Sequence, residues 1–427
     1  MSTQTVNVLI LGATGYTGTL ITEYLEQHPE RTKFSLGIAG RSLEKLQKLK
    51  KDLSLSAGVK LFAFNLSDEH AINDTVRRAN VIINCIGPFW RYSTPIVRAC
   101  AVNGVHYVDI TGEPWWIRDL LREYDFTAMK SKAIIIPASG MDSVPSDLAV
   151  YLSARALLKR GEGITLGKSV TAIRVPPGLS GGTLSTVLSA AELPKSKLIG
   201  LEDPFALTPA KGIVRPFKMV HSLPFTSIYG GQSLMESINE KIVNRTWGLL
   251  EADALSTELS ASRHAPPFRY GPNFVYQEFS QTPSRFAGLM LSVMYFFGAA
   301  VVFLFPPVRW FLKRFGPQPG GGPKQVFTDK AKIVYTNVTS TDGPKPEHVK
   351  TRVEFRGGAY TTTAVLVSES ALAILFNHAE LPKLGQAGGI LTPMAALGDT
   401  LVTRLLNSGR LTYDTHTLHP GESRKAV

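Results

Sequence analysis

Cysteine is scarce in this sequence. Only Cys85 and Cys100 occur among its 427 residues, and such a pair supports neither a disulfide framework nor a zinc site. The first strand is not preceded by the charged region, apolar region and cleavage site of a secretory signal. We therefore expect a protein that is not secreted, that folds in a reducing compartment and that has no metal site.

Charged residues are also few, at 19% of the chain, whereas hydrophobic residues make up 44%. This composition favours packed domains over global disorder, and 427 residues are enough for two of them. The formal net charge of +12 would suit nucleic acid, an anionic membrane surface or a phosphate-bearing ligand. Zinc-finger spacing, an aromatic RNA-binding run and a dense Lys/Arg block are all missing, so we expect no nucleic-acid partner.

The most informative stretch lies near the start of the chain. An apolar run at residues 6–11 predicts a buried strand, a glycine-rich turn follows at residues 12–18, and residues 19–27 have the pattern of a helix. A strand, a glycine turn and a helix start in this order form a cradle for a pyrophosphate, because the free N–H groups of the helix face the turn. The alternative is a tight strand-to-helix turn that binds nothing.

Each glycine of this turn has a separate task in a dinucleotide site. Gly12 allows the sharp turn at the strand end, Gly15 lets the pyrophosphate approach the backbone, and Gly18 lets the helix pack closely on the strand. We expect the cofactor to be contacted by the whole turn, which also contains Thr14, Tyr16 and Thr17.

An acidic residue is missing where an NAD-selective fold would have one. The second strand, at residues 33–39, runs into Gly40, Arg41 and Ser42, and no Asp or Glu follows it directly. A guanidinium and a hydroxyl suit a 2′-phosphate better than a ribose hydroxyl. We therefore expect NADP(H) rather than NAD(H), with Arg41 and Ser42 in contact with it; the alternative is that Arg41 is a solvated loop residue.

Further strands are predicted at residues 60–65, 81–84, 106–109 and 133–137. Because ligands bind beyond the carboxyl ends of such parallel strands, we expect Asn84, Gly87 and Pro88 to form the wall beside the nicotinamide. The alternative for Gly87 and Pro88 is a rigid strand-to-helix loop.

Several proton-transferring side chains follow these strands. Tyr92, Asp109 and Glu113 are our candidates for proton delivery. For Asp109 and Glu113, a structural role in the loops is equally plausible. We interpret Asp142 and Asp147 as loop or capping residues of a helix at 148–158 rather than as catalytic groups.

The pattern changes in the second half of the chain. Residues 169–175, 333–339 and 350–355 alternate as in strands with one exposed face. Helices are predicted at 361–378 and 392–406, and a last strand at 411–415. A turn at residues 181–183 could hold an anionic group or cap the helix that follows it. We thus predict a doubly wound parallel Rossmann domain at residues 1–160 and a mixed α+β substrate domain at 161–427.

One stretch does not fit a soluble domain. Residues 286–305 contain no charge, and residues 308–315 are basic and aromatic. Twenty apolar residues are long enough to span a bilayer, but a full span would separate the later strands from their sheet partners. We therefore expect residues 286–315 to lie on one leaflet as a membrane-associating segment, followed by a Gly/Pro linker at 316–324. The alternative is a buried core helix.

These motifs together resemble the saccharopine dehydrogenase-like oxidoreductases. The resemblance rests on residues 12–18, 39–42, 84–89, 109–113 and 140–145. Residues 181–183, the apolar stretch, the linker and residues 391–393 are similar to the membrane-associated branch of that family, which is also similar to trans-acting enoyl reductases. The chain departs from the family pattern at Ser93, Thr94 and Met141, which lie in the predicted substrate wall.

The resemblance implies a Rossmann domain, an NAD(P)(H) cofactor and a location on the cytoplasmic face of lipid droplets or intracellular membranes. Our first hypothesis is an NADP(H)-dependent oxidoreductase of lipid or glycolipid metabolism, acting on a lipid-linked or apolar small molecule. The second is a soluble saccharopine-type amino-acid dehydrogenase. The third is a protein without enzymatic activity that binds NADP(H) on lipid droplets.

Overall fold

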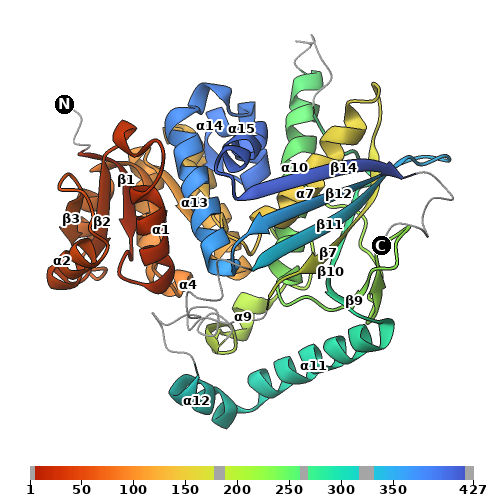
Figure 1. Cartoon of the computed structure of the whole chain (residues 1–427), viewed down its shortest axis with the longest axis horizontal. Helices are drawn as coiled ribbons and strands as arrows, with labels where there is room; N and C mark the ends of the chain where they lie inside the picture. The colour runs from red at the N-terminus through yellow and green to blue at the C-terminus, as the bar shows by residue number, and fades with distance from the viewer. Residues whose placement is uncertain (1–4, 177–187, 260–267, 317–330, 419–427) are drawn as a thin grey trace.

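The computed structural model describes residues 5–176, 188–259, 268–316 and 331–418. In this part of the chain the strands form two seven-stranded sheets. The first sheet lies at the left of Figure 1 and the second crosses the right half, with blue C-terminal helices between them. The predicted turn at 181–183 and the linker at 317–324 lie outside the described residues.

The first sheet is parallel at every pairing, with the strand order β13-β6-β5-β4-β1-β2-β3. The chain runs outward from β1 to β3 and then returns to place β4 on the other side of β1, which makes the β1–β4 boundary the switch point of a doubly wound fold. The predicted α/β fold is confirmed. The strands are β1 (Val6–Leu11), β2 (Leu36–Gly40), β3 (Lys60–Ala63), β4 (Ala79–Asn84), β5 (His106–Asp109), β6 (Ile134–Ile136) and β13 (Gly389–Ile390).

Helices cover both faces of this sheet, and β1 shows how its alternating side chains serve them. Val8 and Ile10 belong to the core beneath α1, α2 and the C-terminal helices, whereas Leu9 and Leu11 belong to the core beneath α3, α5 and α6. A strand buried on both faces must be apolar throughout. The helices are α1 (Tyr16–Glu26), α2 (Leu43–Asp52), α3 (Glu69–Val76), α4 (Phe89–Tyr92), α5 (Thr94–Asn103) and α6 (Pro114–Ser131).

The next helix, α7 (Val144–Leu158), starts four residues before the predicted start at residue 148. Pro145 fits its first turn, because proline is tolerated where the backbone N–H has no partner inside the helix. Asp147 therefore lies within α7 and does not cap it, which corrects the capping prediction. The Asp147 carboxylate instead accepts a hydrogen bond of 3.0 Å from the backbone N–H of Met394 in the first turn of another helix.

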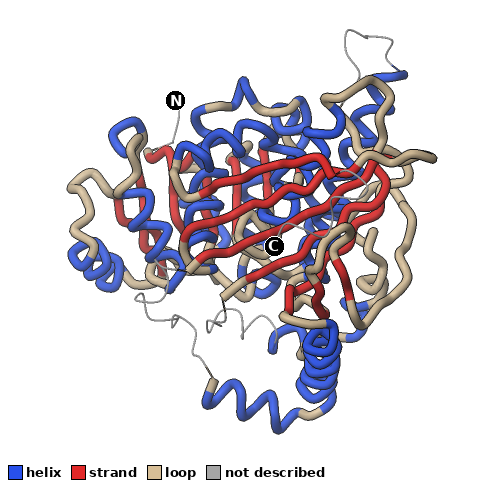
Figure 2. Tube along the Cα trace, turned by 45° about the vertical axis from the view of Figure 1, so that its right-hand side comes forward, coloured by secondary structure: helices blue, strands red, loops and turns tan. Residues whose placement is uncertain are grey.

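The second sheet has the order β14-β12-β11-β7-β10-β9-β8, with antiparallel pairs except for the parallel pair β7–β10. Its long strands run diagonally across Figure 2, in front of the first sheet. This confirms the predicted mixed second sheet, although β10 was not predicted. The strands are β7 (Leu166–Arg174), β8 (His221–Ser222), β9 (Tyr229–Gly231), β10 (Val275–Thr282), β11 (Lys332–Thr341), β12 (His348–Arg356) and β14 (Leu411–Leu418).

The predicted exposed face of β7 is wrong, because its polar side chains are buried. The Asn337 amide on β11 donates hydrogen bonds of 2.9 Å to the hydroxyls of Ser169 and Thr171 on β7. All three residues are fully buried beneath neighbouring elements. The alternation of polar and apolar residues in β7 thus reflects a buried polar face and not an exposed one. Polar side chains can be buried when they hydrogen-bond to one another.

The C-terminal part of the chain returns to the first sheet. Helix α13 (Ala359–Phe376) packs against α1 and β4, and β13 pairs with β6. Helices α14 (Lys383–Ala387) and α15 (Pro393–Asn407) accompany this return. The predicted division into residues 1–160 and 161–427 therefore does not describe the first sheet completely, because a strand and covering helices come from beyond residue 350.

The apolar stretch forms an exposed helix. Helix α11 (Arg285–Leu304) and the short α12 (Pro306–Phe315) run along the lower edge of Figure 1, away from the body of the protein. Both α11 and α13 are long and apolar enough to cross a membrane, but 67% of the apolar stretch of α13 is buried inside the protein, against 11% of that of α11. The alternative of a buried core helix for residues 286–305 is therefore wrong.

Candidate active site

A large cavity opens at the carboxyl ends of β1, β2 and β4, where the two sheets meet. Its volume is about 1370 Å³, which is enough for a dinucleotide and a substrate together. The glycine turn after β1 lines one part of the cavity. Residues from β7, β10 and the first turn of α13 line another part, so both halves of the chain contribute to one site.

The glycine turn has the geometry of a phosphate cradle. Gly12 has φ of +76°, a conformation that favours glycine, and the turn leads to Gly15 at the N-cap of α1. A Cβ on Gly18 would lie 2.3 Å from the carbonyl oxygen of Gly12, so only glycine permits this approach of helix to turn. Thr14, Tyr16 and Thr17 line the cavity together with the glycines. A pyrophosphate fits here, facing the N-terminus of α1.

The end of β2 provides the groups expected for a 2′-phosphate. Arg41 lines the cavity, as does Lys45 in the first turn of α2, which was not among the predicted site residues. Lys45 follows Arg41 by four residues, across the N-cap of α2, and these two neighbouring cations were the available signal. Ser42 does not line the cavity; its hydroxyl caps α2 by accepting a hydrogen bond of 3.2 Å from the Lys45 N–H. The prediction that Ser42 contacts the cofactor is therefore not supported by its position.

Asn84, a predicted cofactor contact, is a buried structural residue. Its amide donates hydrogen bonds to the Ser93 hydroxyl at 2.8 Å and the Tyr107 hydroxyl at 2.9 Å, and its oxygen accepts one from the Ile86 N–H at 3.0 Å. All polar atoms of the side chain are thus used to shape the loop after β4. Gly87 and Pro88 at the end of that loop do line the cavity.

Glu113, a candidate proton donor, is fully buried and does not line the cavity. Its two carboxylate oxygens accept hydrogen bonds from the Phe89 N–H at 3.0 Å and the Trp90 N–H at 2.8 Å. These are the first free N–H groups of α4, so Glu113 fixes the segment that follows Pro88. Burial raises the pKa of Glu113 to about 7, although the two N–H donors favour the ionised form.

Asp109 is also buried behind the wall rather than facing the cavity. Its carboxylate accepts hydrogen bonds from the Thr111 N–H at 3.0 Å, the Ala138 N–H at 2.9 Å and the Tyr107 hydroxyl at 2.8 Å. Burial raises the pKa of Asp109 to about 6. Asp109 therefore joins the loops after β5 and β6, and the structural role that the sequence left open is the one its contacts favour.

Tyr92 is the one of these three candidates whose side chain reaches the cavity. It lies at the end of α4, is 43% exposed and lines the opening. Asp142, which was expected to be a loop or capping residue, also lines the cavity, and burial raises its pKa to about 6.

The other side of the cavity comes from residues far away in the sequence. Ile173, Val175, Leu234, Met235 and Ile238 supply an apolar lining. Tyr360 and Thr363 reach the cavity from the first turn of α13. Two glycines, at residues 357–358, come directly before α13. They could have indicated from the sequence that the N-terminus of α13, like that of α1, lies at the cavity.

Comparisons with known proteins agree with this arrangement. Residues 8–136 match the family model of the saccharopine dehydrogenase NADP binding domain. The chain is 29% identical, over 94% of its length and 96% of the relative, to a protein of Mycobacterium tuberculosis (strain H37Rv) provisionally named as a trans-acting enoyl reductase. With coverages of 94% and 96%, it is also 29% identical to the trans-acting enoyl reductase of Mycobacterium ulcerans (strain Agy99).

The fold has a counterpart of known structure. Apo saccharopine dehydrogenase (L-Glu forming) from Saccharomyces cerevisiae matches with a TM-score of 0.52 and 12% identity, over 97% of this chain and 100% of that chain. The match covers both sheets, and the cradle geometry and the family match concern the same first domain. The chain is therefore similar to these reductases along nearly its whole length, it shares its fold with saccharopine dehydrogenase, and its first domain matches an NADP binding domain.

Proposed function

We propose that this protein uses NADPH to reduce a double bond of a lipid-linked, apolar substrate at a membrane or lipid-droplet surface. The observation that carries the proposal is a single cavity in which a dinucleotide cradle faces an apolar wall from the second sheet. When bound, the nicotinamide would supply the hydride. The chain itself binds the phosphates, orients the substrate and excludes water.

The charges at the two ends of the cavity support this assignment. Arg41 and Lys45 lie at the ribose end, where they suit a 2′-phosphate. Near the nicotinamide wall, Arg91 pairs at 3.2 Å with Glu192, which also pairs with Lys313 and so offsets the charge of Arg91 in part. A substrate such as saccharopine carries three carboxylates and would need several free cations. The apolar lining instead suits a hydrocarbon chain, and the names of the relatives suggest an enoyl group.

The exposed helix α11 is attached directly to a segment that lines the cavity. The Ser292 hydroxyl on α11 accepts a hydrogen bond of 2.8 Å from the Gln232 N–H, and Ser233 to Met235 then line the cavity. A Cβ on Gly231 would lie 2.1 Å from the Gly288 carbonyl oxygen, so α11 packs here against bare backbone.

Helix α12 is joined to the body of the protein by an ion pair and has the charge for an anionic lipid surface. Lys313 pairs with Glu192, which also pairs with the cavity residue Arg91. Arg309, Lys313 and Arg314 lie on α12 without any acidic residue, beside exposed aromatic side chains such as Trp310. An α11–α12 pair held on a membrane would therefore keep the cavity next to the lipid surface.

The proposal can be tested with the full chain bound to vesicles of phosphatidylcholine and phosphatidylglycerol. We expect NADPH to bind at least about tenfold more tightly than NADH in a fluorescence titration. We also expect NADPH to be oxidised when a long-chain trans-enoyl N-acetylcysteamine thioester is added. Oxidation of saccharopine in place of reduction of the thioester would assign the protein to amino-acid metabolism, and cofactor binding without any turnover would favour a non-enzymatic role.

A further inference from the structure

Asp142 presents a carboxylate to the cavity that none of the other described residues hydrogen-bonds. It lies in the loop between β6 and α7, and its Oδ2 is 3.5 Å from the point where a Cβ on Gly112 would stand. Gly112 also lines the cavity, so the missing side chain leaves space in front of the carboxylate. The half-buried Asp142 side chain thus faces the space where a substrate would lie.

The backbone around Asp142 is held firmly, in contrast to its side chain. The Ser139 N–H donates to the Asp109 carbonyl oxygen at 2.7 Å, and the Ala138 N–H donates to the Asp109 carboxylate. The Met141 N–H donates to the Thr363 hydroxyl at 3.2 Å, which ties the loop to the first turn of α13. The loop is therefore preorganised while the carboxylate stays available.

Other buried carboxylates of the protein are used differently. Asp109 and Glu113 accept hydrogen bonds from backbone N–H groups, and Asp147 accepts one from the Met394 N–H. Glu278 accepts hydrogen bonds from Ser146 and from Tyr276, both at 2.8 Å. Structural carboxylates in this fold thus have donors directed at them, and Asp142 departs from that rule where the cavity begins.

Burial makes Asp142 easier to protonate than a solvent-exposed aspartate. Burial raises the pKa of Asp142 to about 6. Burial also raises the pKa of the Tyr335 phenol on β11, and the nearby carboxylates of Glu278 and Asp142 add to that rise. Arg91 and Arg174 line the same cavity. A carboxyl group with a pKa near the working pH is suited to general acid catalysis.

We propose that Asp142 is a catalytic residue, the proton donor in the reduction. This inference rests on the proposed function. As the hydride from NADPH forms a C–H bond at the β-carbon of the enoyl group, the π electron pair moves to the α-carbon or carbonyl oxygen. The Asp142 carboxyl gives its proton to that electron pair, which completes the reduction of the double bond. Asp142 is left as a carboxylate and regains a proton from solvent through the open cavity, while the cofactor leaves as NADP⁺.

The test compares Asp142→Asn with Asp147→Asn, which alters a buried carboxylate of α7 that does not line the cavity. With the enoyl thioester and vesicles described above, Asp142→Asn should lower turnover by about a hundredfold or more. It should change NADPH affinity less than twofold. Asp147→Asn should retain turnover within about threefold of the unmodified protein.

A second readout does not depend on turnover. The infrared difference between the unmodified protein and Asp142→Asn, both with NADP⁺ bound, should contain a protonated carboxyl band that disappears with a midpoint close to pH 6. Absence of this band from pH 5 upward would overturn the assignment, as would turnover by Asp142→Asn within tenfold of normal or loss of NADPH binding in that variant. If the unmodified protein does not reduce the thioester, the proposed function itself fails and Asp142 loses its role with it.

Discussion

At the scale of single residues, the cradle depends on glycine, which has no Cβ atom. A Cβ on Gly18 would lie 2.3 Å from the Gly12 carbonyl oxygen and 2.9 Å from the Ala13 Cα, and these are backbone atoms that cannot move cheaply. We expect Gly18→Ala to lower the free energy of unfolding by about 1–3 kcal/mol and to weaken NADPH binding at least about tenfold. Urea unfolding and fluorescence titration measure the two effects.

Gly58 provides the control, because a Cβ there would meet nothing within 4 Å. Gly58→Ala should change the free energy of unfolding by no more than about 0.5 kcal/mol and leave NADPH affinity unchanged. Equal effects of the two substitutions would show that the close approach at Gly18 does not matter.

Arg41 determines a second prediction at this scale. If it binds the 2′-phosphate, Arg41→Ala should raise the Kd for NADPH about tenfold to a hundredfold, since a hydrogen bond to a charged group contributes about 1.5–3 kcal/mol. The Kd for NADH, which lacks that phosphate, should stay the same. Lys48→Ala is the matched control, because Lys48 lies on α2 but pairs with Asp52 at the surface, away from the cavity. An equal loss of NADH affinity in Arg41→Ala would contradict the assignment.

Sequence predicted the site residues that are fixed by local backbone geometry. Gly12, Gly15 and Gly18 line the cavity because strand, turn and helix are contiguous in the chain. Side-chain roles were less predictable, as Asn84 and Ser42 show. The Ser42 hydroxyl and the Asn84 amide are both used in hydrogen bonds within the protein and not in the cavity. One partner of Asn84, Tyr107, lies on another strand. Sequence composition does not reveal where such partners lie.

At the scale of whole elements, α11 makes the sharpest prediction about location. Phe297 on α11 is 71% exposed, so a charge there should disturb a lipid contact without disturbing a core. We expect Phe297→Glu to weaken binding to phosphatidylcholine–phosphatidylglycerol vesicles at least about tenfold in a flotation assay, because an anion is costly at the lipid boundary.

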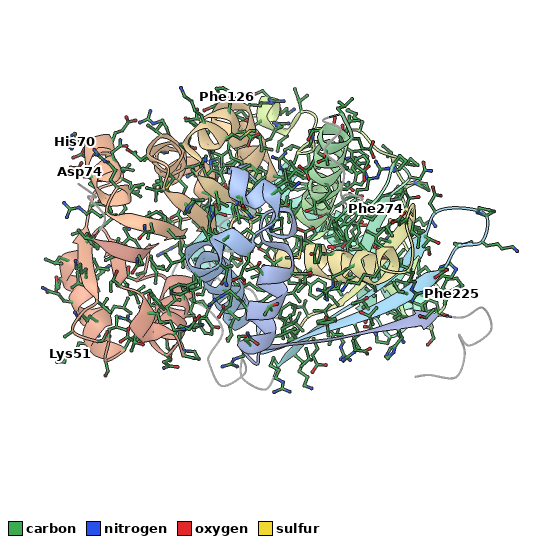
Figure 3. All side chains as sticks on the ribbon, turned by 90° about the horizontal axis from the view of Figure 1, so that it is seen from above. Lys51, His70, Asp74, Phe126, Phe225 and Phe274 are labelled. Atoms are coloured by element: carbon green, nitrogen blue, oxygen red, sulfur yellow. The ribbon has the colours of Figure 1, made fainter. Side chains whose placement is uncertain are left out.

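Phe126→Glu is the control for this experiment. Phe126 on α6 is 78% exposed and lies at the upper edge of the molecule in Figure 3, on a helix that covers the first sheet. It should bind vesicles like the unmodified protein. If Phe297→Glu also binds normally, α11 is not the lipid contact.

Element boundaries were predicted where the apolar pattern was strong and local. The strand β4 ends at Asn84 as predicted. The strand β10 was not predicted, because it contains buried polar residues such as Gln277 and Glu278 and therefore has no clear apolar pattern. The fate of residues 286–305 could not be decided from their composition alone. The same apolar character describes α13, which is buried, and α11, which is exposed.

At the scale of the whole molecule, an ion network joins the ends of the chain. The Arg404 guanidinium on α15 contacts Glu369 on α13 at 2.8 Å and Glu30, which follows α1, at 2.7 Å. His28 is 2.9 Å from the same Glu369 carboxylate, which is almost completely buried. Sequence could not predict this contact, because His28 and Glu30 are more than three hundred positions away from their partners Glu369 and Arg404 and no pattern links them.

Removal of the Arg404 charge should therefore be costly. Arg404→Met would leave the buried Glu369 with less compensation, and we expect the free energy of unfolding to fall by about 3–5 kcal/mol. Arg98→Met, which breaks a more exposed pair with Glu69, should cost less than about 1 kcal/mol. Similar urea-unfolding midpoints for the two variants would contradict a structural role for the network.

Buried carboxylates give the whole protein a pH-dependent stability. Burial raises the pKa of Asp109 to about 6 and those of Glu113, Asp147 and Glu278 to about 7, whereas the same groups titrate near pH 4 in an unfolded chain. Between these values the folded protein holds more protons than the unfolded chain, so the free energy of unfolding decreases as the pH rises. We expect the free energy of unfolding, measured in urea, to fall from about pH 4.5 to pH 7. Above pH 7 these four groups should make no further contribution to the change.

Asp147 allows this dependence to be assigned to a single group. Its Oδ2 accepts the Met394 N–H, while its Oδ1 is buried without a hydrogen-bond partner. Asp147→Asn retains the acceptor and removes the titration, so the decline in stability between pH 5 and pH 7 should become shallower by up to about 1.4 kcal/mol per pH unit. Arg98→Met again serves as the comparison, since it should leave the slope unchanged. A slope that is identical in Asp147→Asn would mean that this carboxyl group is already ionised in the folded protein, and that burial between α7 and α15 is too weak to hold its proton.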